Sequence, residues 1–321
     1  MLVETTDEKA RRLLALSREL HWAFPSSQGT PIIRGHATSQ PIEQAAKERE
    51  SYATAAHVLF DSGDEEGAVE VASYAWRLWV VARDNAGGRA FLASVLDKGH
   101  KKPSRARSLA LYGDSLLAFR QGKKEESRRR SEEALDAALI VNDREALTLA
   151  NLALSRIAFE DGDYGHGLTL AVKAREFARS LGPAMGQAPL FLHAQATRMT
   201  GDYDQAAALF EQSLDLNRKI EDEGMVRAEL QNLGLVEIHR GNVDVAERYF
   251  AESEKLGVAD DPYGTAMTSL FHALITLARG DKNKSRTLLQ RAQSILKEVK
   301  MDPAPDDQFE INWLHDNLEE D

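Results

Sequence analysis

Turn sequences built around a glycine recur along this chain at a nearly constant interval. Gly122, Gly162, Gly201, Gly241 and Gly280 each end a run with helical spacing, and neighbouring glycines lie 39 or 40 residues apart. A fixed period of roughly 20 to 50 residues is typical of repeat proteins, in which each repeat buries its apolar face against the next. The chain is therefore predicted to fold as a stack of similar units.

Each period contains two segments whose apolar residues follow helical spacing. The first helices of the pairs are predicted over 105–121, 144–161, 184–200, 224–240 and 262–279, and the second helices over 123–141, 163–181, 202–220, 242–257 and 282–299. Glycine suits the break within a pair because it accepts the left-handed conformation that ends many helices. The same interval before Gly122 predicts a sixth pair over about 65–83 and 86–99, preceded by helices at about 7–22 and 42–62.

The predicted fold class is all-α, with about six helix pairs between capping helices. Three segments are expected: an N-terminal helix and loop over 1–41, the repeat array over 42–299 and an acidic C-terminal capping helix over 300–321. Residues 302–321 of the last segment hold eight acids and no Lys or Arg, and these acids are expected on a solvated outer face. Its apolar residues, expected to cover the last pair, are Phe309, Trp313, Leu314 and Leu318.

Small residues recur at fixed distances from the turn glycine. They fall seven before it (Ser115, Ser155, Ala194, Gly234, Ala273), five after it (Ser127, Gly167, Ala206, Ala246, Ser285) and twelve after it (Ala134, Ala174, Ser213, Ser253, Ala292). A large residue falls nine after it at Phe210, Phe250 and Leu289. This pattern, clearest in NLGLVEIHRGNVDVAERYFAES, resembles a lengthened tetratricopeptide repeat over about residues 65–299. The resemblance implies a right-handed α-solenoid whose first helices line a concave groove.

A narrower resemblance begins at ERESYATAAHVLFDSGDEEGAVEVASYAWRLWVVARDNAGGRAFLASVL. Paired tryptophans, Trp76 and Trp79, precede a Gly-Arg-containing helix and then the long repeats. This order is similar to the C-terminal sensor region of bacterial LuxR-type and antibiotic-regulator-type signalling ATPases, and it implies that the repeats sense a ligand or partner. The chain contains no GxxxxGK[ST] phosphate loop, so ATPase activity and DNA binding are not implied. It is either a free-standing relative or a sensor piece without its effector.

The net charge of the chain and its lack of catalytic and metal-binding motifs argue against several classes of function. Lys and Arg total 40 against 51 acids, and the net charge of −11 disfavours nucleic acid and anionic membranes as partners. The absence of cysteine excludes thiol chemistry, and no metal-ligand spacing or nucleophile–base set is found. We expect no enzyme activity, no catalytic residue, no metal and no cofactor. The first residues carry no signal-peptide pattern and no run reaches 18 apolar residues, so a cytoplasmic location is expected.

Residues on the predicted groove face form the candidate binding site. They are Arg156, Phe159, Phe191, Gln195, Arg198, Gln231, Asn232 and His239. The arginines suit the carboxylate of an acidic or C-terminal peptide segment, the amides suit peptide backbone, and the phenylalanines supply apolar contact. Trp76 and Trp79 are expected at an apolar end of the same groove. The alternative is that the arginines pair with acids inside the protein and the apolar ends are core.

These features favour a non-catalytic module that binds a protein or peptide through its concave groove, as a sensor or adaptor in bacterial signalling. Two alternatives stay open: a scaffold that self-assembles into a homo-oligomer through the repeat array, and a receptor for a signalling peptide. The sequence does not identify the partner. No membrane partner is expected.

Overall fold

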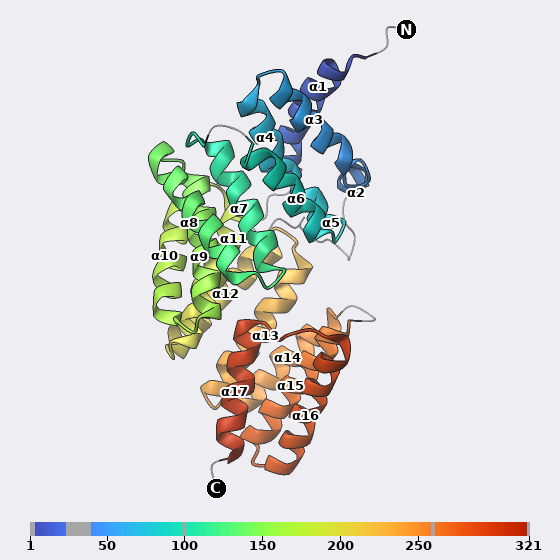
Figure 1. Cartoon of the computed structure of the whole chain (residues 1–321). Helices are drawn as coiled ribbons and strands as arrows, with labels where there is room; N and C mark the ends of the chain where they lie inside the picture. Colours follow the sequence, from blue (N-terminus) through green and yellow to red (C-terminus); the bar gives the residue numbers. More distant parts are fainter. Residues whose placement is uncertain (1–3, 24–39, 99–100, 258–260, 320–321) are drawn as a thin grey trace. The chain divides into compact units, whose positions relative to one another are not determined.

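The computed structural model describes residues 4–23, 40–98, 101–257 and 261–319, and in that part of the chain it contains helices and no strand (Figure 1). None of its helices has the length and apolar character needed to cross a membrane. The helices are α1 Thr6–Ala23, α2 Gln40–Lys47, α3 Arg49–Asp61, α4 Glu65–Ala75, α5 Arg77–Val81, α6 Asn85–Leu96, α7 Arg105–Phe119, α8 Lys124–Val141, α9 Arg144–Glu160, α10 Tyr164–Ala178, α11 Pro183–Met199, α12 Tyr203–Lys219, α13 Glu223–His239, α14 Val243–Lys255, α15 Pro262–Ala278, α16 Lys282–Val299 and α17 Pro305–Glu319.

The six predicted pairs are all present, and their ends differ from the predicted ends by a few residues at most. The five regular pairs are α7–α8, α9–α10, α11–α12, α13–α14 and α15–α16. In the first pair the first helix is divided at Trp76 into α4 and α5, and α6 is the second helix. The all-α repeat fold is therefore confirmed. The Pro/Gly/Ser-rich link predicted between the first two helices falls largely outside the described residues.

The turn glycines adopt the predicted backbone conformation. Their φ angles are positive: 68° at Gly122, 75° at Gly162, 89° at Gly201, 79° at Gly241 and 86° at Gly280. A residue with a Cβ atom is strained there, which explains why glycine recurs at this position. An aspartate that follows the glycine then caps the next helix, as in α12, where the Asp202 carboxylate accepts a hydrogen bond from the Gln205 amide at 3.1 Å.

The small and large positions of the repeat form the core between helices. Every residue at the three small positions is buried. The large residues Phe210, Phe250 and Leu289 are also buried, with at most 2% of each residue exposed. Short side chains let two helices approach, and the large side chain fills the space next to them. The repeat spacing deduced from the sequence is therefore confirmed at the level of side-chain packing.

The chain divides into two compact units. Unit 1 contains the described residues up to Asp161 together with Thr169–Pro189, and unit 2 contains Gly162–Leu168 and the described residues from Leu190 onward. In unit 1, α1 packs against α3 and α4. In unit 2, α17 packs against α15 and α16 (Figure 1).

The C-terminal helix α17 differs from a simple end cap. Leu314 and Leu318 are buried with the core residues of α15 and α16, as predicted. Glu310, which the acidic pattern placed in solvent, is instead fully buried, because it pairs with Arg198 and His239 from other helices of unit 2. The aromatic rings of Phe309 and Trp313, on the same helix, also contact the His239 ring. The predicted solvated acidic face is therefore wrong at Glu310.

Enlarging a small position should separate the helices. Ala206→Leu or Ala246→Leu is expected to lower the free energy of unfolding by about 1 to 3 kcal/mol, because both alanines are fully buried between helices. Urea denaturation measures this loss. Ala208→Leu is the matched control, since Ala208 lies on α12 but is exposed. Equal midpoints for Ala206→Leu and Ala208→Leu would contradict the packing described here.

Candidate functional site

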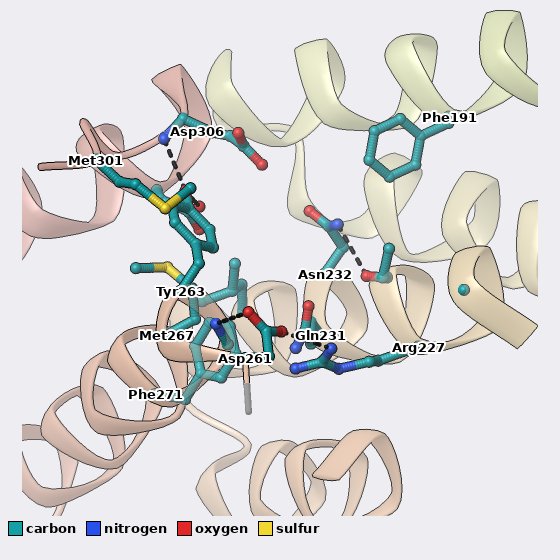
Figure 2. A pocket seen from close by; sticks show the side chains of 16 residues that line it. Phe191, Arg227, Gln231, Asn232, Asp261, Tyr263, Met267, Phe271, Met301 and Asp306 are labelled. Carbon is teal, nitrogen blue, oxygen red and sulfur yellow. Dashed lines mark hydrogen bonds and ion pairs between the residues drawn. The ribbon is translucent and has the colours of Figure 1, made fainter. Parts of the chain in front are cut away.

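A pocket of about 430 Å³ lies in unit 2 (Figure 2). Helix α13 contributes one face to it, with Arg227, Gln231 and Leu235 at successive turns, because residues three to four apart lie on the same side of a helix. Helix α15 contributes Tyr263, Gly264, Met267 and Phe271 in the same way, and α11 contributes Phe191. The residues that close the fourth side are Met301, Ala304, Asp306 and Asp307, from the α16–α17 connection and the first turn of α17.

Three predicted site residues, Phe191, Gln231 and Asn232, come together in this pocket. Asn232 is 5% exposed, and its Nδ2 donates a hydrogen bond to the Ala228 carbonyl oxygen at 3.0 Å. Its Oδ1 is buried and has no hydrogen-bond partner among the residues that the structure describes, and Figure 2 shows it directed toward the middle of the pocket. A buried acceptor without a partner is costly, so a donor from a ligand would be stabilising there.

Two sets of hydrogen bonds hold the polar side chains of the pocket, one at Asp261 and one at Tyr263. The Asp261 carboxylate caps α15 by accepting a hydrogen bond from the Gly264 amide at 3.0 Å, and Arg227 donates to it at 3.3 Å. Tyr263 donates its hydroxyl proton to Asp307 at 2.5 Å and accepts a hydrogen bond from the Ala304 amide at 2.8 Å. Tyr263 therefore ties the start of α17 to α15.

Acidic groups outnumber basic ones among these residues. Loss of solvation, together with the neighbouring charge of Asp306, raises the pKa of Asp307 above its ordinary value. Burial likewise raises the pKa of Tyr263 above its ordinary value. Because Arg227 is paired with Asp261, Asp306 leaves the pocket with a net negative charge. An acidic ligand, predicted from the arginines, does not suit this pocket.

Two other predicted site residues, Arg198 and His239, meet at Glu310 of α17. Arg198 is fully buried and forms an ion pair with the Glu310 carboxylate. His239 Nε2 lies 2.9 Å from Glu310 Oε2. The Tyr203 ring stacks on His239 at 4.7 Å between ring centroids, and the Trp313 ring meets His239 edge-on at 5.0 Å. The carboxylate predicted for a ligand is therefore supplied by the protein itself, and Arg198 does not line an open groove.

The remaining predicted residues are placed separately. Gln195 on α11 is buried, with 6% exposed. Arg156 and Phe159 belong to α9 of unit 1, where Arg156 donates a hydrogen bond to the Tyr112 hydroxyl at 3.3 Å and Phe159 is buried. A single groove holding both Arg156 and Arg198 would join the two units and stays a prediction.

The paired tryptophans of unit 1 do not form the apolar end of a groove, although the sequence predicts this. Trp76 and Trp79 are both buried in unit 1. Trp79 stacks on Phe91 at 4.6 Å between ring centroids, and Trp76 meets Tyr112 edge-on at 6.1 Å. Both residues are core, as the alternative interpretation of the groove ends required.

A buried carboxyl group lies on α13 beside α12. Glu229 is fully buried, and it accepts hydrogen bonds at Oε1 from the Ser213 hydroxyl and from Asn217 Nδ2, the latter at 3.1 Å. Its Oε2 has no hydrogen-bond partner. Burial raises the pKa of Glu229 from 4.5 to about 8. The folded protein therefore keeps a proton that the unfolded chain releases between these pH values.

This proton makes stability depend on pH. Between about pH 4.5 and pH 8 the Glu229 contribution to the free energy of unfolding should fall by about 1.4 kcal/mol per pH unit. Glu229→Gln keeps the shape of the side chain but removes the group that titrates. The free energy of unfolding of this variant, relative to that of the unmodified chain, should therefore rise by about 2 to 3 kcal/mol from pH 6 to pH 8. Urea denaturation at several pH values measures this difference. Glu211→Gln, at an exposed position of α12, should show no such trend.

Neither a protein-family model nor a curated protein sequence matches this chain. Among solved structures, it is similar to a Rap protein complexed with Competence and Sporulation Factor, with a TM-score of 0.64 and 13% identity over 92% of this chain and 78% of that chain. It is also similar to NprR in complex with its cognate peptide NprX, with a TM-score of 0.56 and 17% identity over 87% of this chain and 83% of that chain.

A third similar structure is Cut9 in the Cut9–Hcn1 hetero-tetramer of the APC/C. Its TM-score is 0.58 at 15% identity, and the alignment covers 87% of this chain but 47% of that chain, about half its length. At these identities the likenesses concern the fold alone. Together with the helix pairs and their packing, they show that the chain has a tetratricopeptide-like helical-repeat fold.

Proposed function

We propose that this chain is a non-catalytic module that binds a peptide, or an extended segment of a partner protein, in the unit 2 pocket. The observation that carries the proposal is Asn232, a buried amide on the pocket wall whose Oδ1 has no hydrogen-bond partner within the described ranges of the chain. A peptide backbone offers N–H donors to such an acceptor. Gln231, one residue away on the same helix, supplies a second amide to the pocket.

Apolar side chains of the ligand would contact the wall formed by Phe191, Met267 and Phe271. The net negative charge contributed by Asp306 favours a neutral or basic segment over an acidic one. Arg156 and Phe159 of unit 1 remain candidates for a separate contact with the partner.

Two of the similar structures support a peptide as the ligand class. One is a Rap protein complexed with Competence and Sporulation Factor, and the other is NprR with its cognate peptide. We therefore place this chain, as part of the proposal, among sensors or adaptors of bacterial signalling, with a signalling peptide as one form of the ligand. The resemblance to the sensor region of LuxR-type signalling ATPases agrees with such a role.

A capture experiment tests the proposed function. The full-length protein is immobilised and exposed to a pool of synthetic heptapeptides randomised at every position, and retained peptides are identified by mass spectrometry. Asn232→Leu, which keeps the branched shape of the side chain but removes the amide, should reduce retention by about tenfold, because one or two hydrogen bonds are lost. The matched control is Gln290→Leu, which removes an exposed amide of α16. Retention that is equal in all three proteins, or absent from all, would refute the proposal.

One observation favours the scaffold as a second candidate. Leu139 and Ile140, at the end of α8, are 59% and 69% exposed, although most large apolar residues in the described part of unit 1 are buried. Exposed apolar groups of this kind often mark contacts between proteins. Light scattering on the full-length protein separates the candidates, since an oligomer that Ile140→Asp dissociates would support the scaffold.

A further inference from the structure

We propose that Arg198 and His239 form a carboxylate site that the acidic segment of a partner protein can occupy by displacing α17. In this structure Glu310 of α17 fills the carboxylate site. The inference goes beyond the proposed function, because the carboxylate site uses the C-terminal ends of α11 and α13 and includes neither Gln231 nor Asn232.

The carboxylate site is built from several helices of unit 2. Arg198 lies in the last turn of α11 and His239 is the last residue of α13, and both side chains reach Glu310. Tyr203, at the start of α12, holds the His239 ring by parallel stacking at an interplanar angle of 4°. These three groups belong to the repeat array, and only the carboxylate comes from α17.

Glu310 satisfies Arg198 incompletely. In the described part of the chain, one terminal nitrogen of the Arg198 guanidinium group bonds to Glu310, whereas Nε and the other terminal nitrogen are buried without a hydrogen-bond partner. A guanidinium group can bind a carboxylate through two parallel hydrogen bonds, which is stronger than one. A carboxylate that approaches in that geometry would therefore bind Arg198 better than Glu310 does.

The chain connection allows α17 to leave without breaking a helix pair. Helix α16 ends at Val299, the next residue, Lys300, has a φ of 54°, and residues 301–304 are not helical. Helix α17 is held by its first-turn contact with Tyr263, by Glu310 and the rings beside it, and by the apolar residues Ile311, Leu314 and Leu318. Two hydrogen bonds also join it to α16: Arg286 donates to the Leu318 carbonyl oxygen at 3.1 Å, and Gln293 Nε2 lies 3.0 Å from His315 Nε2. The helix pairs of unit 2 are complete without α17, so its release is a local event.

The sequence of α17 indicates the chemistry of the partner segment. Glu310 lies between Phe309 and Trp313, whose rings both lie against His239, with centroids 6.3 Å and 5.0 Å away. Arg198 also lies over the Phe309 ring at 5.9 Å. A partner segment should therefore carry an acidic residue, with one aromatic residue directly before it in the sequence and a second aromatic residue one helical turn after it.

Binding of a defined peptide in solution tests the inference on the full-length protein. The probe is a fluorescent synthetic peptide with the sequence of residues 303–321, PAPDDQFEINWLHDNLEED. Glu310→Gln in the protein should weaken the docking of its own α17 and raise the affinity for the probe by about tenfold, because a hydrogen bond to a charged group is lost from the competitor. Asp316→Asn is the control, since Asp316 is an exposed acid of the same helix, and it should bind the probe as the unmodified protein does.

A second probe carries Glu310→Gln and should bind about tenfold more weakly to every protein form, including the unmodified one. Hydrogen exchange should become faster over 305–319 in the Glu310→Gln protein while α15 stays protected, which shows that the protein remains folded. Equal affinity for the two probes, or unchanged exchange in α17, would overturn the inference. A Glu310→Gln protein that dimerises by exchanging α17 would also overturn it, because the site would then take a second copy. None of these results depends on the heptapeptide capture by Asn232.

Discussion

Replacing Asp114 with alanine should lower the free energy of unfolding of unit 1 by about 3 to 5 kcal/mol. Asp114 lies on α7 and is 1% exposed. One of its carboxylate oxygens accepts a hydrogen bond from Arg89 Nε and the other from Arg130 Nε, each at 2.8 Å. The arginines come from α6 and α8, so a single acid joins three helices. Without it, two largely buried guanidinium groups would lose their shared carboxylate.

Urea denaturation followed by circular dichroism measures this loss, and hydrogen exchange in α7 assigns it to unit 1. Asp136→Ala is the matched control, because Asp136 is an exposed acid of the neighbouring helix α8. It should change stability by less than about 0.5 kcal/mol. A loss for Asp114→Ala that is no larger than this control would show that Glu126, Asp97 and Glu133, which also bond to the two arginines, compensate fully.

The sequence was sufficient to predict the helix pairs because their signals are local and repeated. Each turn glycine, each capping aspartate and each small residue acts on neighbours within one period, and every period repeats the signal. The Asp114 contacts have no such signal. Arg89 is 25 residues before Asp114 and Arg130 is 16 residues after it, and long charged side chains reach partners at many spacings. Which arginine meets which acid therefore depends on the three-dimensional packing of the pairs.

The candidate site likewise contains residues whose placement could be predicted from the sequence and residues whose contacts could not. Gln231 and Asn232 could be predicted because they lie on the regular first helix of a repeat. The role of Arg198 could not be predicted, because its partner Glu310 is 112 residues later in the chain and follows the last regular pair. The contact from Tyr263 to Asp307 also crosses 44 residues into the α17 segment. Periodicity places a side chain on a helix face, but it does not show which non-repeated segment will cover that face.

Phe250→Ala should lower the free energy of unfolding of unit 2 by about 3 to 5 kcal/mol, through lost apolar burial and the cavity left behind. Phe250 is 1% exposed and stacks on Phe271 at 4.6 Å between ring centroids, so it joins α14 to α15. On its other side it contacts α13 at Gly234, where an added Cβ atom would overlap the Phe250 ring. The small position at Gly234 and the large position at Phe250 therefore contact each other directly, and the residue that fits at one depends on the residue at the other.

A double-mutant cycle tests this coupling by urea denaturation. Gly234→Ala alone should cost about 1 to 3 kcal/mol, because its methyl group collides with the Phe250 ring. In the Phe250→Ala background the same methyl group enters the vacated space, so Gly234→Ala should cost little or should restore stability. Additive losses would mean that the two positions act independently. Coupled losses would show that Gly234 is required because Phe250 is large, which is the physical basis of the repeat pattern read from the sequence.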